Sequence, residues 1–195
     1  MRRRSLATAI RTPLAAALLA SLALLPAALL AGCVTRHPVP PVADYLLAEG
    51  FGARRPADVA VLPVEGNLPP ETAEVLREAL RRGLLERRFA PVRSKEVGAR
   101  PGEFRPGGAN AVMTVSVEKW GDADLYGAGT VKFSGEVRLF LAGSPEPVYR
   151  GTLRDVVVSA RMTAHSMEDR PRTVVRAAEE TVVLLLARLP VKGDG

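Results

Sequence analysis

The segment TVKFSGEVRLFL, residues Thr130–Leu141, decides the fold class because its apolar and polar residues alternate. A period of two is typical of a strand with one face in a core. Residues 109–120 before it and 148–159 after it show a similar pattern, with turn residues between. We therefore expect a three-stranded meander. The side chains expected on the buried face of its middle strand are Val131, Phe133, Val137, Leu139 and Leu141.

Upstream, residues 58–64 form a short run rich in β-branched residues, which fits a strand buried on both faces. Apolar residues three and four apart predict an amphipathic helix over 71–88, with Pro70 in its first turn. Residues 89–92 form another short strand candidate, and a second apolar stripe predicts a helix over about 171–189. The expected order is β-α-β-β-β-β-α. This order indicates an α/β (α+β) two-layer domain, in which the helices pack on one face of a mixed sheet.

The front of the chain has the pattern of an export signal. Four arginines precede an Ala- and Leu-rich run that ends at Gly32, and no acid occurs before Asp44. The run is also long enough to cross a membrane as a helix. Its last residues, Leu30, Ala31 and Gly32 before Cys33, resemble the lipobox of bacterial lipoproteins. That resemblance implies signal cleavage after residue 32 and attachment of fatty acids such as palmitate at Cys33. An uncleaved anchor helix with an incidental cysteine is the alternative.

The predicted location is the periplasmic side of the outer membrane. In enterobacterial lipoproteins an aspartate after the lipidated cysteine retains the protein in the inner membrane, and this chain has Val34 and Thr35 there. Residues 1–32 are then the signal peptide, 33–57 a lipidated proline-rich tether, 58–190 one periplasmic domain, and 191–195 a polar tail. Within the tether, residues 45–48 could make a short helical turn or pack on the domain.

Charge gives no support for nucleic-acid binding once the signal is removed. The whole chain has 27 basic and 21 acidic residues, and four of the basic ones lie in residues 1–32. The remaining excess of two positive charges is too small to indicate a nucleic-acid partner. Cys33 is the only cysteine, so an intramolecular disulfide is excluded and packing must stabilise the domain.

Several short strings resemble a family of bacterial lipoproteins known from neisserial surface-antigen surveys. They are Asp44-Tyr45, Arg55-Pro56, the strand-like residues 59–63, residues 108–120 and residues 131–151. The resemblance implies a fold like the TolB amino-terminal domain, the curli secretion lipoprotein and the lipoprotein activators of peptidoglycan synthases. The turn at residues 144–147 and Tyr149 depart from the family pattern, which has a Thr-Gly-Lys-like turn and a tryptophan. No catalytic residues carry over from this family.

The sequence offers no convincing catalytic, cofactor or metal site. His37 lies in the tether, and the adjacency of His165 and Ser166 does not build a nucleophile and base. A calcium loop beginning at Asp122 and Asp124 fails, because Tyr126 replaces an oxygen ligand. Gly66 lies where phosphate loops occur, but its neighbours include no lysine. We therefore expect no enzyme activity and no cofactor. Trp120 is a candidate partner contact, or it caps the end of the sheet.

The favoured hypothesis is a non-enzymatic interaction or scaffold component of an envelope assembly for secretion or wall synthesis. It would contact the membrane through its lipid and bind a protein of the cell envelope. Two alternatives stay open. One is a ring-forming secretion component, which makes the chain a homo-oligomer, and the other is a small-ligand or lipid carrier beside a transporter. The carrier hypothesis predicts a roomy apolar pocket between sheet and helices.

Replacing Cys33 by alanine should block lipidation, since no other thiol is present to accept the acyl group. We expect the Cys33→Ala protein to accumulate with its signal attached, or in a soluble form. Membrane fractionation with mass spectrometry of the amino-terminal peptide measures this. A mature-sized, acylated Cys33→Ala protein in the membrane fraction would contradict the lipoprotein assignment.

Overall fold

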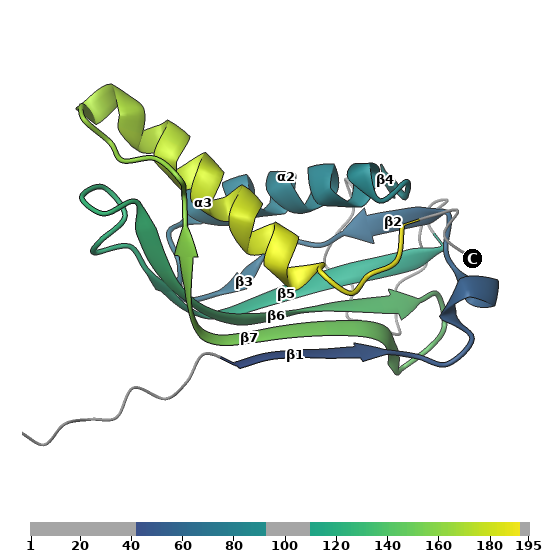
Figure 1. Cartoon of the computed structure of the whole chain (residues 1–195). Helices are drawn as coiled ribbons and strands as arrows, with labels where there is room; N and C mark the ends of the chain where they lie inside the picture. The colour runs from purple at the N-terminus through teal and green to yellow at the C-terminus, as the bar shows by residue number, and fades with distance from the viewer. Residues whose placement is uncertain (1–41, 93–109, 192–195) are drawn as a thin grey trace, which may run out of the picture. The chain divides into compact units, whose positions relative to one another are not determined.

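The computed structural model describes residues 42–92 and 110–191, and one sheet under two helices accounts for most of them (Figure 1). The helices are α2 (Pro70–Glu86) and α3 (Arg170–Leu185), and two short 3-10 helices are η1 (Phe51–Arg54) and η2 (Met167–Asp169). The strands are β1 (Val42–Leu47), β2 (Asp58–Val61), β3 (Glu65–Gly66), β4 (Ala90–Val92), β5 (Ala111–Gly121), β6 (Thr130–Leu141) and β7 (Pro147–Ser159).

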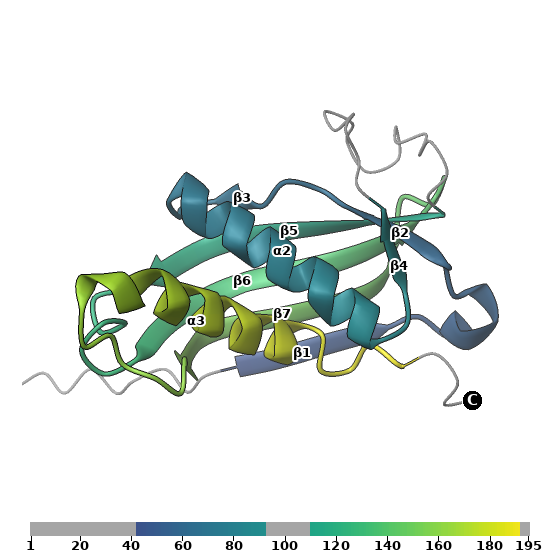
Figure 2. The same ribbon diagram turned by 90° about the horizontal axis from the view of Figure 1, so that it is seen from above.

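The strand order in the sheet is β1-β7-β6-β5-β2-β4, and β3 pairs with β5 beyond the end of β2. Strands β5, β6 and β7 form the predicted antiparallel meander, and β1 adds to β7 in antiparallel fashion. Strands β2 and β4 are parallel and are joined through α2. Both helices cover the same face (Figure 2), so the predicted two-layer mixed fold is confirmed.

Strand β1 corrects the predicted boundary of the tether. The sequence analysis placed residues 33–57 in the tether, but β1 pairs with β7 over six residues. Phe51 of η1 is also buried in the core, so the domain begins no later than Val42. The helical turn considered for residues 45–48 is wrong, because residues 45–47 are extended in β1. An edge strand with both faces largely exposed shows no alternation that a sequence pattern could reveal.

Both helices match the predicted ones and end a little earlier. Helix α2 ends at Glu86, and Arg88 then adopts a left-handed conformation with φ 62°. Helix α3 ends at Leu185, although Leu186 and Leu189 remain buried beyond it. The apolar stripes of the two helices pack on the sheet and on each other, with Gly83 at the contact of α2 with Val182.

Two tyrosines hold the carboxyl end of α3 against the sheet. The Tyr149 hydroxyl of β7 donates to the Leu185 carbonyl at 2.7 Å, and the Tyr45 hydroxyl of β1 donates to the Leu184 carbonyl at 2.8 Å. The last carbonyls of a helix have no partner within the helix, so Tyr149 supplies the donor for Leu185. Tyr45 adds a second donor to Leu184, which also accepts from the Ala187 N–H at 3.2 Å. Gly151 lies under the same helix end, where a Cβ atom would collide with the Leu185 carbonyl oxygen. The close approach therefore requires glycine there.

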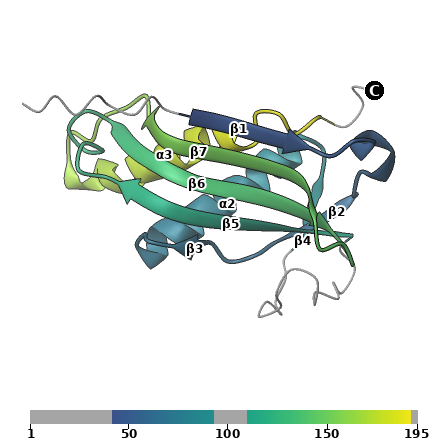
Figure 3. The same cartoon turned by 90° about the horizontal axis from the view of Figure 1, so that it is seen from below.

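None of the described helices covers the opposite face of the sheet (Figure 3), which carries charged side chains on β6 and β7 and the buried apolar pair Val112 and Phe140. Arg138 of β6 lies opposite Arg150 of β7 in the strand register. Like charges in that position repel. Nearby carboxylates offset this repulsion, because Glu136 pairs with Arg138 and Asp44 lies 3.9 Å from Arg150. Over residues 42–92 and 110–191, no helix has the length and apolarity needed to cross a membrane.

Replacing Tyr149 by phenylalanine should lower the free energy of unfolding by about 1–3 kcal/mol, because the buried Leu185 carbonyl loses its donor. Burial also raises the pKa of Tyr149 above its ordinary value of 10.0. The folded state therefore favours the neutral phenol, and this stabilisation is present below pH 10 and lost as the pH rises above it. Urea denaturation from pH 7 to 11 measures both effects. Equal stability of the two proteins at pH 7 would contradict this role.

Candidate functional site

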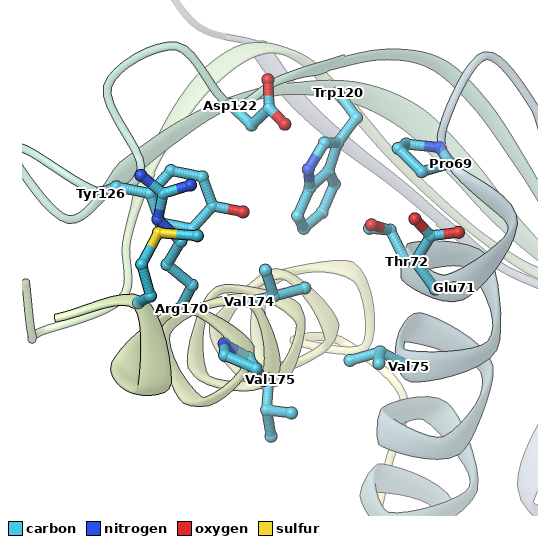
Figure 4. Close-up of a pocket in the computed structure, with 12 residues that line it drawn as sticks. Pro69, Glu71, Thr72, Val75, Trp120, Asp122, Tyr126, Arg170, Val174 and Val175 are labelled. Carbon is cyan, nitrogen blue, oxygen red and sulfur yellow. The ribbon is translucent and has the colours of Figure 1, made fainter. Parts of the chain in front are cut away.

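A groove of about 620 Å³ lies where the amino-terminal ends of α2 and α3 meet the loop between β5 and β6 (Figure 4). Helix α2 contributes its first two turns on one side, and α3 contributes its first two turns on the other. Trp120 and Tyr126 come from β5 and the loop that follows it. Ten of the residues that line the groove are Pro69, Glu71, Thr72, Val75, Trp120, Asp122, Tyr126, Arg170, Val174 and Val175.

A β-bulge directs Trp120 into this groove. The pairing of β5 with β6 shifts between Val117 and Lys119, so Glu118 is an extra residue. Without the shift, alternation from Ala111 through Val117 would place Trp120 on the face of the sheet opposite the helices. The bulge reverses this and places Trp120 opposite Phe133, on the face under the helices. Bulges commonly re-aim a side chain in this way.

Trp120 is buried but keeps a free polar group. Its side chain is 9% exposed, and its ring meets Phe133 edge to face with centroids 6.2 Å apart. None of the described residues accepts a hydrogen bond from its indole Nε1, which faces the side of the groove where Tyr126 lies (Figure 4). Although most of the ring is buried, the Nε1 atom itself is not sealed in the core and opens to the groove. The indole is therefore a donor that a bound group could satisfy.

Thr72 and Tyr126 add two hydroxyls to the same groove. Thr72, in the first turn of α2, is 6% exposed, and its hydroxyl has no hydrogen-bond partner among the residues that the structure describes. The Tyr126 hydroxyl likewise has none there, and Figure 4 shows it pointing toward Trp120. Three groups that can donate hydrogen bonds thus surround an apolar space walled by Val75, Val174 and Val175.

The rim of the groove carries the carboxylates of Glu71 and Asp122 and the guanidinium of Arg170, which contacts an aromatic ring. Within residues 42–92 and 110–191, neither Glu71 nor Asp122 forms an ion pair. The Arg170 guanidinium lies 4.7 Å from the centre of the Tyr126 ring, in a cation–π contact. The exposed edge of the groove is therefore slightly acidic.

This arrangement has the features of a binding site. Unpaired donors on apolar and aromatic walls are typical of recognition sites, in which a few polar groups fix the orientation of the occupant. The described part of the chain holds no group of three His, Cys, Asp or Glu side chains that could bind a metal ion. The groove volume falls within the range of small-ligand sites, so the carrier hypothesis remains a prediction.

The other residues singled out in the sequence are not brought into this groove. Leu30, Ala31, Gly32, Cys33 and His37 lie outside the described residues. Ser166 and Asp169 form a capping box at η2, in which the Ser166 hydroxyl donates to the Asp169 carboxylate at 2.9 Å. These hydrogen bonds lower the pKa of Asp169.

His165 is exposed and lies 3.3 Å from the Thr163 hydroxyl, so it is not paired with Ser166. The Asp122 and Asp124 carbonyls accept backbone hydrogen bonds from Leu125 and Ala128, which makes that segment a turn. Gly66 is in β3, beside Val117 of β5.

Of the groove residues, sequence reasoning identified only Trp120 as a candidate contact. Their sequence pattern places Thr72 and Val75 in the predicted helix over 71–88, and Val174 in the predicted helix over about 171–189. Helices α2 and α3 are about 100 residues apart in sequence, and their meeting depends on the tertiary fold. A lone tryptophan beside two aspartates was the only local signal.

Comparison with known proteins shows the fold. No protein-family model matches this chain, and no curated protein matches it in sequence. A variant of PelC from Paraburkholderia phytofirmans, solved as a dodecamer, superposes with a TM-score of 0.50. It is 16% identical, over 75% of this chain and 96% of that chain. At this identity the likeness shows a shared fold alone.

Two further solved structures are similar at lower scores. A DUF4136 family protein from Bacteroides thetaiotaomicron has a TM-score of 0.46 and 11% identity, over 78% of this chain and 98% of its own. A lipoprotein from Neisseria meningitidis has a TM-score of 0.43 and 14% identity, over 62% of this chain and 95% of its own. At these scores neither carries an argument about this chain.

Proposed function

We propose that this chain is a lipid-anchored protein of the bacterial outer membrane, with its domain in the periplasm, that works by binding and not by catalysis. It serves as an interaction component of an envelope assembly. The observation that carries the proposal is the sequence Leu30-Ala31-Gly32-Cys33 at the end of the apolar run. Two or more acyl chains at one residue give stable anchoring, whereas a single chain is marginal.

The groove around Trp120 supplies the binding half of the proposal. It combines apolar walls, aromatic side chains and hydrogen-bonding groups without partners in the described structure. Tryptophan and tyrosine are enriched among residues that dominate protein interfaces. The groove is formed largely by regular elements, so its shape exists before a partner arrives and less ordering entropy is lost on binding.

The groove lies at the end of the sheet where the chain from Cys33 enters β1. Val42, the first residue of β1, pairs with Arg154, and Trp120 is linked by strand pairing through Phe133 to Val156. The entry of the tether and the groove are therefore at the same end of the sheet.

A ring-forming secretion component is the second candidate, and the shared fold with the dodecameric PelC variant favours it. The sheet offers a contact for such assembly. Strand β1 pairs only with β7, and no other described strand pairs with its outer edge. The side chains of Val42, Leu46 and Leu47 in β1 are exposed. Exposed apolar edge strands tend to pair with another chain.

Photocrosslinking at the groove tests the binding proposal. A photoreactive residue at Met167, which lines the groove and is 70% exposed, should give a discrete adduct with a protein in intact cells. The matched control is Val157 on the face opposite the helices, which is 57% exposed and lies outside the groove. Mass spectrometry then identifies the adduct. Equal labelling from both positions, or none from Met167, would count against a partner at the groove.

Native mass spectrometry in detergent tests the ring. A closed ring predicts one large assembly of defined stoichiometry, and replacing the exposed Leu46 and Leu47 by lysine should dissociate it, because charged edge strands resist pairing. The single exchange Val157→Lys serves as the surface control. A wild-type protein that stays monomeric at all concentrations would exclude this candidate.

A further inference from the structure

The unpaired groups of the groove define the chemistry of its occupant. Trp120 offers an indole N–H, and Thr72 and Tyr126 offer hydroxyls, so the occupant should bring acceptors. The walls are apolar and aromatic, so it should bring compact apolar groups. Glu71 and Asp122 have no ion-pair partner in the described structure, so it should also carry positive charge.

A proline-rich peptide with a basic residue has these properties. Each proline has a backbone carbonyl that accepts hydrogen bonds but no backbone N–H, so it can bind hydrogen-bond donors of the groove without itself requiring an acceptor. Its ring fixes the backbone in the extended polyproline II form, so little entropy is lost on binding. Segments of the pattern P-x-x-P dock into grooves lined by aromatic residues for these reasons.

This chain contains such a peptide just before the first described residue. Residues 36–41 read Arg-His-Pro-Val-Pro-Pro, in which Pro38 and Pro41 fit P-x-x-P. Arg36 precedes the prolines and matches the carboxylates on the rim of the groove. The segment ends at Pro41, directly before Val42 of β1.

The strand register decides whether this segment can fill the groove of its own molecule. Three strand spacings separate β1 from β5, and Val42 is offset by two residues along the strand from the level of Trp120. With standard sheet dimensions, the two residues are about 16 Å apart. A fully extended chain spans at most about 3.6 Å per residue, so the four residues from Pro38 to Val42 reach at most about 14 Å. The motif cannot centre on its own Trp120.

We infer that the Trp120 groove binds the proline-rich segment Arg36–Pro41 of a second copy of this chain. The Trp120 N–H and the two hydroxyls donate to carbonyls of the segment, the proline rings fill the space between Val75 and Val174, and Arg36 pairs with Glu71 or Asp122. Copies anchored on one membrane have a raised local concentration, which favours the exchange. Lipidation promotes this contact but is not required for it.

Trp120 is the only tryptophan in the chain, so its fluorescence reports on the groove directly. In the processed protein purified in detergent, raising the concentration should shift the emission to shorter wavelength and reduce quenching by acrylamide. For the triple variant Pro38→Ser, Pro40→Ser, Pro41→Ser, the emission wavelength and the acrylamide quenching should not change with concentration and should equal those of the dilute wild type. Pro145→Ser, an exposed proline in the β6–β7 turn, is the matched control and should behave as the wild type.

A synthetic peptide of residues 34–43 separates the segment from the rest of the chain. Added to the triple variant, it should produce a saturable shift in the Trp120 emission. The same peptide with its three prolines replaced by serine should produce none. An Arg36→Glu peptide should bind about two- to five-fold more weakly, as expected for a partly exposed ion pair.

Trp120→Phe retains the aromatic ring but removes the N–H donor, and by calorimetry it should bind the wild-type peptide more weakly. An unchanged denaturation midpoint for this variant shows that any loss of binding is not a loss of folding.

Three results would overturn the inference. The first is emission of the wild type that matches the triple variant at every concentration. The second is a difference between them that does not depend on concentration, which would place the segment on its own molecule. The third is peptide binding without any self-association, which would assign the groove to a segment of another protein. The mass of residue 33, measured separately, shows whether the anchor itself is present, so failure of the two proposals can be told apart.

Discussion

The hydrogen bonds from Tyr149 and Tyr45 to the last carbonyls of α3 are the contact on which the rest of the arrangement depends. They join the end of one helix to two neighbouring strands, and Gly151 gives the helix room to approach. With one end fixed, the opposite end of α3 is directed toward Trp120. Arg77 plays a comparable role for α2, since it donates two hydrogen bonds to the Val61 carbonyl at the end of β2. The space between the two helices follows from these attachments.

The spacing of apolar residues predicted those helices and strands that bury one face and are long enough for the spacing to repeat. The meander of β5, β6 and β7 and both helices belong to this class. Strand β1 was missed because its side chains are mostly exposed on both faces, and prolines before it suggested a tether. Strand β3 has only two residues, too few for any period. The missed strands are those that bury little side-chain surface and are held mainly by backbone pairing, with Tyr45 of β1 the exception.

The site was less predictable than the fold. The bulge at Glu118 reverses the face on which Trp120 lies, and its only mark in the sequence is the pair of adjacent polar residues Glu118 and Lys119. Gly135 pairs with Val117 at that level, and a Cβ atom there would press on the Ser116 carbonyl oxygen at 2.6 Å. Position 135 therefore requires a residue without a Cβ atom, but a single glycine within a strand pattern does not by itself indicate this close approach. Thr72 and Val174 become neighbours of Trp120 only after the helices pack, so no local rule could select them.

The position of β1 also sets how the domain would respond to a pull on the proposed lipid anchor at residue 33. Tension on residue 33 would enter the fold at Val42 and act along the axis of β1. The six-residue pairing with β7 runs parallel to that axis, so its hydrogen bonds would be sheared together and not opened one after another. The Tyr45 bond to α3 would share the load. Under the proposed anchoring, this edge strand would act as a mechanical clamp that holds the folded domain.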